Sequence, residues 1–76
     1  MNDKKEILLK FAKHLTKIRI DKGLSIRQLA AASGLEYSQL QRIEKGKVNF
    51  AFSTLCALTE GLDMELSELL ENYQLY

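Results

Sequence analysis

The chain has 76 residues, of which 46% are hydrophobic and 28% charged, and its formal net charge at pH 7 is +1. A chain of this length forms one small domain, because it buries too little surface to support two separate cores. No segment reaches the roughly 18 consecutive apolar residues of a membrane span, and the amphipathic start of the chain lacks the apolar core of a secretory signal. We therefore expect a cytoplasmic protein that has no contact with a membrane.

The charges are divided unevenly along the chain. Residues 1–47 contain eleven basic and five acidic residues, a net charge of +6, whereas residues 48–76 contain five acidic and no basic residues, a net charge of −5. This separation predicts one surface that attracts a polyanion and another that repels it.

The composition and the spacing of apolar residues predict an all-α fold. Proline is absent, glycine is infrequent, and no segment alternates β-branched with polar residues. A first helix is predicted over Lys4 to Asp21, and Gly23 is a suitable residue for its C-terminal stop. The apolar stripe of this helix is Ile7, Leu8, Phe11, Leu15 and Ile18.

Two shorter helices are predicted next, with a glycine between them. Ser25 is a good N-cap for a helix that extends to about residue 32, and Gly34 lies where the chain must bend sharply. The second of the pair is expected over about 36–46, with Gly46 as its stop. Apolar residues of both point into a shared core: Leu29, Ala30, Leu35, Leu40 and Ile43. This is a helix-turn-helix pattern.

The remaining sequence predicts two more helices. The helix over about 52–61 is expected to bury Phe52, Leu55, Leu58 and Leu62. The helix over about 66–73 carries Leu66, Leu69, Leu70 and Tyr73. Cys56 is the single cysteine, so no internal disulfide can form, and we interpret it as a small buried residue.

The outer side of the helix over about 36–46 carries a phenol, a hydroxyl, an amide and a guanidinium, in Tyr37, Ser38, Gln41 and Arg42. Such groups can read the edges of bases. Arg42 can form a bidentate contact with O6 and N7 of guanine, and Ser38, one turn earlier, can bond to several bases. For Tyr37 either the ring meets a thymine methyl or the hydroxyl meets a phosphate. The alternative for all four is an ordinary solvated helix face.

Several short segments, taken together, resemble the Cro/C1 type of helix-turn-helix, the family of phage repressors and related bacterial regulators. They are KGLS (22–25), LAAASGL (29–35), RIEKGK (42–47), TLCALTEGL and LSELL. The resemblance implies a five-helix lambda-repressor-like fold, with one domain over 1–76 and the helix-turn-helix at about 25–45. It further implies that the third helix enters the major groove of DNA, with Tyr37, Ser38 and Arg42 contacting bases and Gln41 close by.

Phosphate contacts are expected from residues around the reading helix. The helix start after Ser25 presents free amides and a positive dipole end, and Arg27 adds a charge there. The other candidates are Gln39, Lys45, Lys47 and Asn49. The sequence departs from the family at Ile26, where many members have a glutamine that touches a phosphate and supports a reading side chain. It also departs in the loop over 48–52, which is apolar here, whereas in the family this loop is often basic or contains proline.

The resemblance assigns a structural role to Arg19 and Glu44. In the family, an arginine late in the first helix bonds to a glutamate near the end of the third, and these two residues occupy those positions. Such a pair fixes the tilt of the reading helix, because a guanidinium holds a carboxylate at two points.

We expect a small prokaryotic or phage repressor that binds a double-stranded DNA operator as a homodimer. One reading helix contacts few base pairs, so two half-sites are needed. The predicted dimer interface is the apolar tail: Leu66, Leu69, Leu70, Tyr73, Leu75 and Tyr76. The alternative function is an antitoxin-like or other protein-binding module of the same fold.

Catalysis is not expected from this sequence. The chain offers one histidine, His14, one cysteine and no glycine-rich phosphate loop. His14 lies at the border of the apolar stripe of the first helix, where we interpret it as a boundary or surface residue. We expect no enzyme activity, no cofactor and no metal site.

Overall fold

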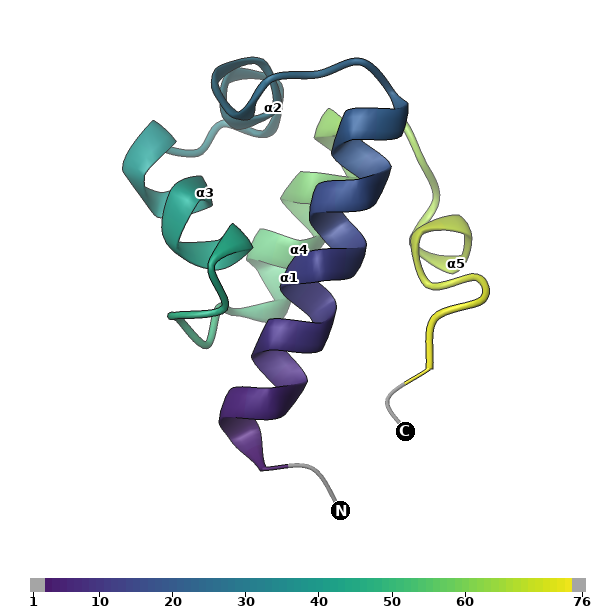
Figure 1. Ribbon diagram of the computed structural model, residues 1–76. Helices are drawn as coiled ribbons and strands as arrows, with labels where there is room; N and C mark the ends of the chain where they lie inside the picture. Colours follow the sequence, from purple (N-terminus) through teal and green to yellow (C-terminus); the bar gives the residue numbers. More distant parts are fainter. Residues whose placement is uncertain (1–2, 75–76) are drawn as a thin grey trace.

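The computed structural model describes residues 3–74, which form five α-helices and no strand. The helices are α1 (Lys4–Asp21), α2 (Ile26–Ser33), α3 (Tyr37–Glu44), α4 (Phe52–Gly61) and α5 (Leu66–Leu69). The long α1 runs through the length of the molecule, with α3 on one side of it and α5 on the other (Figure 1). None of the helices within 3–74 is long and apolar enough to cross a membrane. The predicted all-α architecture is confirmed.

The helix ends follow local sequence signals. The Asp3 carboxylate accepts a hydrogen bond from the Glu6 amide at 2.8 Å, which caps α1. At α2 the Ser25 hydroxyl accepts from the Gln28 amide, and the Gln28 side chain accepts from the Ser25 amide. This capping box confirms the predicted N-cap and sets where α2 begins. Gly34 ends α2 with φ 69°, a left-handed conformation that suits a residue without Cβ.

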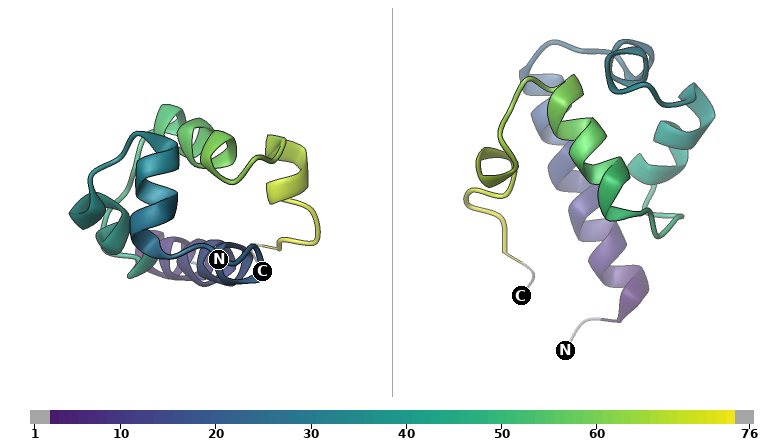
Figure 2. Two further views of the ribbon diagram at one scale, coloured as in Figure 1. Left: turned by 90° about the horizontal axis from the view of Figure 1, so that it is seen from above. Right: turned by 180° about the vertical axis from the view of Figure 1, so that it is seen from behind.

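The core lies between α1 and α4, and it is closed on one side by α2 and α3 and on the other by α5 (Figure 2). Its buried residues come from all five helices: Phe11, Leu15, Leu29, Ala30, Leu40, Ile43, Leu58, Leu62 and Leu69. The predicted shared core of the helix-turn-helix is confirmed, with Leu35 packed at its edge. Because α2 and α3 are both held by this core, their relative orientation is fixed.

The expectation that Phe52 is buried is wrong. Phe52 is the first residue of α4 and is 66% exposed. Phe50 takes the place at the core instead, with its ring 5.6 Å from that of Phe11. The apolar loop over 48–52 therefore inserts one of its two phenylalanines and leaves the other on the surface.

The C-terminal helix is shorter than predicted, because α5 ends at Leu69 and the chain then turns. Leu70 is the C-cap, and Asn72 has a positive φ of 63°. This turn brings Tyr73 back to α1, where its ring meets Phe11 edge-on at 5.9 Å and lies 4.8 Å from the His14 ring. The Nε2 of His14, at 2.5 Å, donates to the Leu69 carbonyl. His14 is half-buried, as a boundary residue should be, and it ties α5 to α1.

The burial of the tail changes the predicted dimer surface. Leu69 is fully buried in its own chain, so it has no surface to offer a partner, contrary to the prediction. Leu66 and Tyr73 are packed against the same core, whereas Leu70 remains 38% exposed. Leu75 and Tyr76 lie outside the described residues.

Candidate nucleic-acid interface

The exposed face of α3 carries the four predicted reading residues. Leu40 and Ile43 turn into the core, which leaves Tyr37, Ser38 and Arg42 exposed and Gln41 half-buried on the other face. The Gln41 Nε2 donates to the Tyr37 hydroxyl at 3.2 Å. Because the hydroxyl accepts this bond, its own proton stays available for an acceptor on DNA. The structure therefore brings the predicted readers together on one helix surface.

The start of α2 contacts the start of α3 through two side chains. The guanidinium carbon of Arg27 lies 4.3 Å from the centre of the Tyr37 ring, a cation–π contact. This contact uses no hydrogen bond of the guanidinium, so its N–H groups remain free to bind a phosphate. Ile26, the residue that departs from the family, is packed against the core instead. This contact between a phosphate candidate and a reading candidate was not predicted from the sequence.

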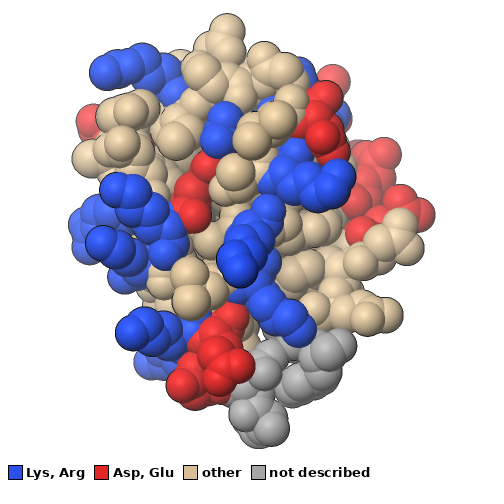
Figure 3. Space-filling model, in the orientation of Figure 1, with Lys and Arg blue, Asp and Glu red and all other residues tan. Residues whose placement is uncertain are grey.

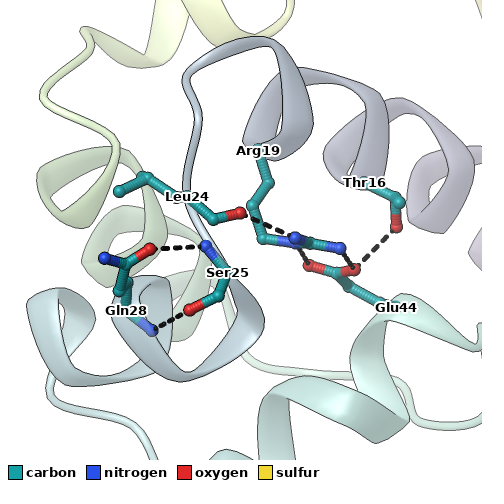
Figure 4. A network of polar contacts seen from close by, with 6 residues as sticks. All are labelled: Thr16, Arg19, Leu24, Ser25, Gln28 and Glu44. Atoms are coloured by element: carbon teal, nitrogen blue, oxygen red, sulfur yellow. Dashed lines mark hydrogen bonds and ion pairs between the residues drawn. The ribbon is translucent and has the colours of Figure 1, made fainter.

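The predicted ion pair between Arg19 and Glu44 is confirmed, and it is bidentate. Arg19 Nε lies 2.7 Å from Glu44 Oε2, and Arg19 Nη2 lies 3.0 Å from Oε1 (Figure 4). The side chains are only 11% and 6% exposed. Thr16 donates to the same carboxylate at 2.9 Å, and Arg19 Nη1 donates to the Leu24 carbonyl at 2.8 Å. This network joins α1, the start of the helix-turn-helix and the end of α3.

The network explains how a short α3 keeps its position. A helix of eight residues has little stability alone, so its tilt depends on tertiary contacts. Two buried charges are stable only if their remaining donors and acceptors are satisfied, as they are here by Thr16 and Leu24. Neither of these two partners was predicted from the sequence.

The predicted phosphate-binding residues lie around the reading face. Ser25, Arg27, Gln39, Lys45, Lys47 and Asn49 are all exposed. The Ser25 hydroxyl and the amides of Ser25 and Gln28 are used in the capping box, which leaves the amides of Ile26 and Arg27 as the free donors at the start of α2. The amide arrangement expected for phosphate binding is therefore partly occupied by the cap.

The surface charge is separated as the sequence predicted. Lys and Arg side chains gather over α3 and along α1, acidic side chains cluster on the side of α5, and a second acidic patch lies at the start of α1 (Figure 3). A hollow beside α5 is lined by Glu60, Asp63, Glu65 and Glu68. A polyanion would therefore approach the side of α3 and be repelled from the side of α5. Among residues 3–74, no three His, Cys, Asp or Glu side chains are grouped to hold a metal ion.

A capped helix, a glycine turn and a second helix with a polar outer face, mounted on a buried ion pair, define a helix-turn-helix domain of the DNA-binding type. A family profile described as the Cro/C1-type HTH DNA-binding domain matches residues 14–74. The chain belongs to this family, which confirms the resemblance found in the sequence.

Known relatives include HTH-type transcriptional regulators. The regulator PuuR of Escherichia coli is 45% identical over 56 residues, which cover 74% of this chain and 30% of PuuR. The chain thus spans less than a third of the length of that relative.

Solved structures share the fold over most of the chain. The restriction-modification controller protein C.AhdI from Aeromonas hydrophila has a TM-score of 0.78 and 39% identity, covering 82% of this chain and 94% of that one. The controller protein C.Esp1396I, solved on a 19 base pair DNA duplex, has a TM-score of 0.83 and 27% identity, covering 88% of this chain and 89% of that one. C.Esp1396I has also been solved as a tetramer on its natural 35 base-pair operator.

Proposed function

We propose that this chain is a transcriptional regulator, acting as a repressor, that binds double-stranded DNA in a sequence-specific manner. The observation that supports this proposal most directly is the exposed face of α3, held by the buried Arg19–Glu44 pair. In the proposed complex α3 lies in the major groove. Arg42 contacts guanine, and Ser38, Gln41 and Tyr37 contact neighbouring bases.

The phosphate contacts of the proposed complex come from both sides of α3. Arg27 and the free amides of α2 bind the backbone on one side, and Lys45, Lys47 and Asn49 bind it on the other, with Gln39 beside α3. These contacts set the register of the protein on the duplex and carry no base preference of their own.

We infer that the chain acts as a homodimer. Two copies place two reading helices in successive major grooves about 34 Å apart. Among the described residues, Leu70 and Phe52 are the exposed apolar side chains near the C-terminal helices, at 38% and 66% exposure, and they are candidates for the contact between copies. Sedimentation of the chain with and without its selected DNA tests this, and a monomer under both conditions contradicts it.

We further propose that the chain works in the cytoplasm by binding alone, with no catalytic step. Its single histidine is already used to hold α5 to α1. A protein-binding module of the same fold is the competing function, and it predicts no preference among DNA sequences.

Selection from a randomised duplex pool tests the function. We expect the pool to converge on an inverted repeat, and we expect the selected site to bind about a thousandfold or more tighter than a scrambled duplex at the same salt concentration. A pool that does not converge, together with equal affinity for all duplexes, contradicts the proposal and favours the protein-binding alternative.

A further inference from the structure

A groove runs between the start of α1 and the turn that follows α3. It has a volume of about 630 Å³. Four lysines and two leucines line it: Lys4, Lys5, Lys45, Lys47, Leu8 and Leu9. No carboxylate contributes to the lining, and all four lysines are exposed. Lys4 and Lys5 precede the other two lysines by 40 residues or more in sequence and reach them only through the fold.

The close approach of the two walls depends on Gly46. Its φ is +69°, and a Cβ placed on it would lie 2.9 Å from the Leu9 Cα. The turn after α3 is therefore pressed directly against the backbone of α1. Lys5 lies one helical turn before Leu9 and shares its face, so it is held next to this turn.

The lysines of the groove are not neutralised by ion pairs with neighbouring carboxylates. Within residues 3–74 none of the four forms an ion pair, whereas Lys17 on the same helix pairs with Asp21 at 3.1 Å. The acidic residues at the start of α1 do not line the groove, and the Asp3 carboxylate is used as the helix cap. Four like charges at one site raise the local potential, and this potential attracts an anion.

We propose that this groove binds the phosphate backbone of DNA beside the bases read by α3, with Lys4 and Lys5 as anchors outside the helix-turn-helix. The inference rests on the proposed function. Lys45 and Lys47 follow α3 directly, so the groove continues the surface of α3. Figure 3 shows Lys and Arg side chains over α3 and beside the start of α1 on the same side of the molecule, with an acidic patch next to them at the start of α1. Ammonium groups bind phosphates as point charges, so the contact adds affinity to every sequence.

The test compares the full chain with the double variant Lys4→Ala/Lys5→Ala. Both lysines lie in the first turn of α1, where a positive charge opposes the helix dipole, so the variant should fold normally. The matched control is Lys13→Ala/Lys22→Ala, which removes the same charge from exposed positions outside the groove and leaves the Lys17–Asp21 ion pair intact. Affinity for the selected site and its single-base variants is measured from about 50 to 200 mM salt.

We expect the groove variant to weaken binding to all duplexes alike and to reduce the salt slope by about one unit for each phosphate that it no longer binds, up to about two. The control should keep the slope of the wild type. Replacing the contacted phosphate with a neutral methylphosphonate should weaken DNA binding by the wild type. It should not weaken DNA binding by the groove variant any further.

Three results overturn the proposal. Equal slopes and affinities for the wild type and the groove variant show that the groove does not touch DNA, while the proposed function stands. If the groove variant keeps the salt slope of the wild type on DNA but loses affinity for poly-glutamate, the groove binds an acidic polypeptide instead. A wild type that binds no duplex removes both the groove proposal and the proposed function.

Discussion

The guanidinium of Arg27 lies over the ring of Tyr37, with its carbon 4.3 Å from the ring centre, and this cation–π contact connects the first turn of α2 to the first turn of α3. The neighbouring position, Ile26, is packed against the core and cannot support a reading side chain. Arg27, one residue later, contacts Tyr37, which is one of the proposed reading residues. The Tyr37 hydroxyl is held as well, by Gln41 at 3.2 Å. Tyr37 is thus positioned before any DNA is bound.

Arg27→Lys should distinguish the role of the contact with the Tyr37 ring from the role of the positive charge. Lysine keeps a cation for a phosphate but lacks the planar face, so we expect an unchanged salt slope and weaker discrimination at the base nearest Tyr37. The reduction in binding free energy on the preferred site should be about 0.5 to 1 kcal/mol. Titrations on single-base variants of the selected site measure it, with Lys22→Ala as the control. Unchanged discrimination would show that the contact does not position Tyr37.

Removing one partner of the Arg19–Glu44 pair should destabilise the fold strongly. Each single substitution to alanine leaves a buried charge without its partner, which should cost about 3 to 5 kcal/mol. Arg19→Lys should recover only part of this, because an ammonium cannot bind both carboxylate oxygens in the same geometry. Denaturant unfolding of both single variants and the double variant gives the coupling energy. Additive losses of stability would mean that the pair is not coupled.

Arg42 and Lys47 should give different binding phenotypes. Arg42→Ala should lose about 1 to 3 kcal/mol on the preferred site and relax the choice of one base in each half-site. Lys47→Ala should weaken binding to all sequences alike and lower the salt slope by about one unit. Titrations at several salt concentrations distinguish the two. If Arg42→Ala leaves base preference intact, Arg42 is a phosphate anchor and the reading falls to Tyr37, Ser38 and Gln41.

Gly46→Ala should destabilise the protein more than Gly34→Ala. Both glycines have φ +69°, so both substitutions force alanine into the left-handed region at about 1 to 2 kcal/mol. Nothing lies within 4 Å of a Cβ at Gly34, whereas a Cβ at Gly46 meets the α1 backbone at 2.9 Å. The additional destabilisation at Gly46 should be about 1 to 3 kcal/mol. Chemical denaturation measures the free energy of unfolding of both variants. Equal losses would show that the turn after α3 can move away from α1 without cost.

Tyr73→Phe should remove a pH dependence and leave the fold intact. Burial raises the pKa of Tyr73 above its ordinary value of 10.0, so the folded chain resists ionisation of this phenol. The contribution of the neutral Tyr73 phenol to the free energy of unfolding is therefore complete below pH 10.0. It is lost as the pH rises through the raised pKa. Its hydroxyl is buried without a hydrogen-bond partner, so phenylalanine should be at least as stable. Melting temperatures from about pH 8 to 11 test this against the wild type, and parallel curves would contradict it.

The helices and the exposed polar face of α3 could be predicted from the sequence alone. Capping residues, stop glycines and the 3.6-residue period act within a few positions of the chain, so Ser25, Gly34 and the bounds of α1 and α4 were predictable. The outward position of Ser38 and Arg42 followed from the same period, because Leu40 and Ile43 had to point inward. The Arg19–Glu44 pair was predictable only through the family resemblance, since its members are 25 residues apart.

Which apolar side chains enter the core, and which charged side chains meet, depends on the packing of the helices and could not be predicted from the sequence. Whether Phe50 or Phe52 entered the core depended on the space beside Phe11. The burial of Leu69 depended on the turn that brings the tail back to α1. The Arg27–Tyr37 contact and the lysine groove arise where segments that are separate in sequence approach each other. Such approaches are set by the packing of all five helices at once, and the local pattern of residues carries no information on those distances.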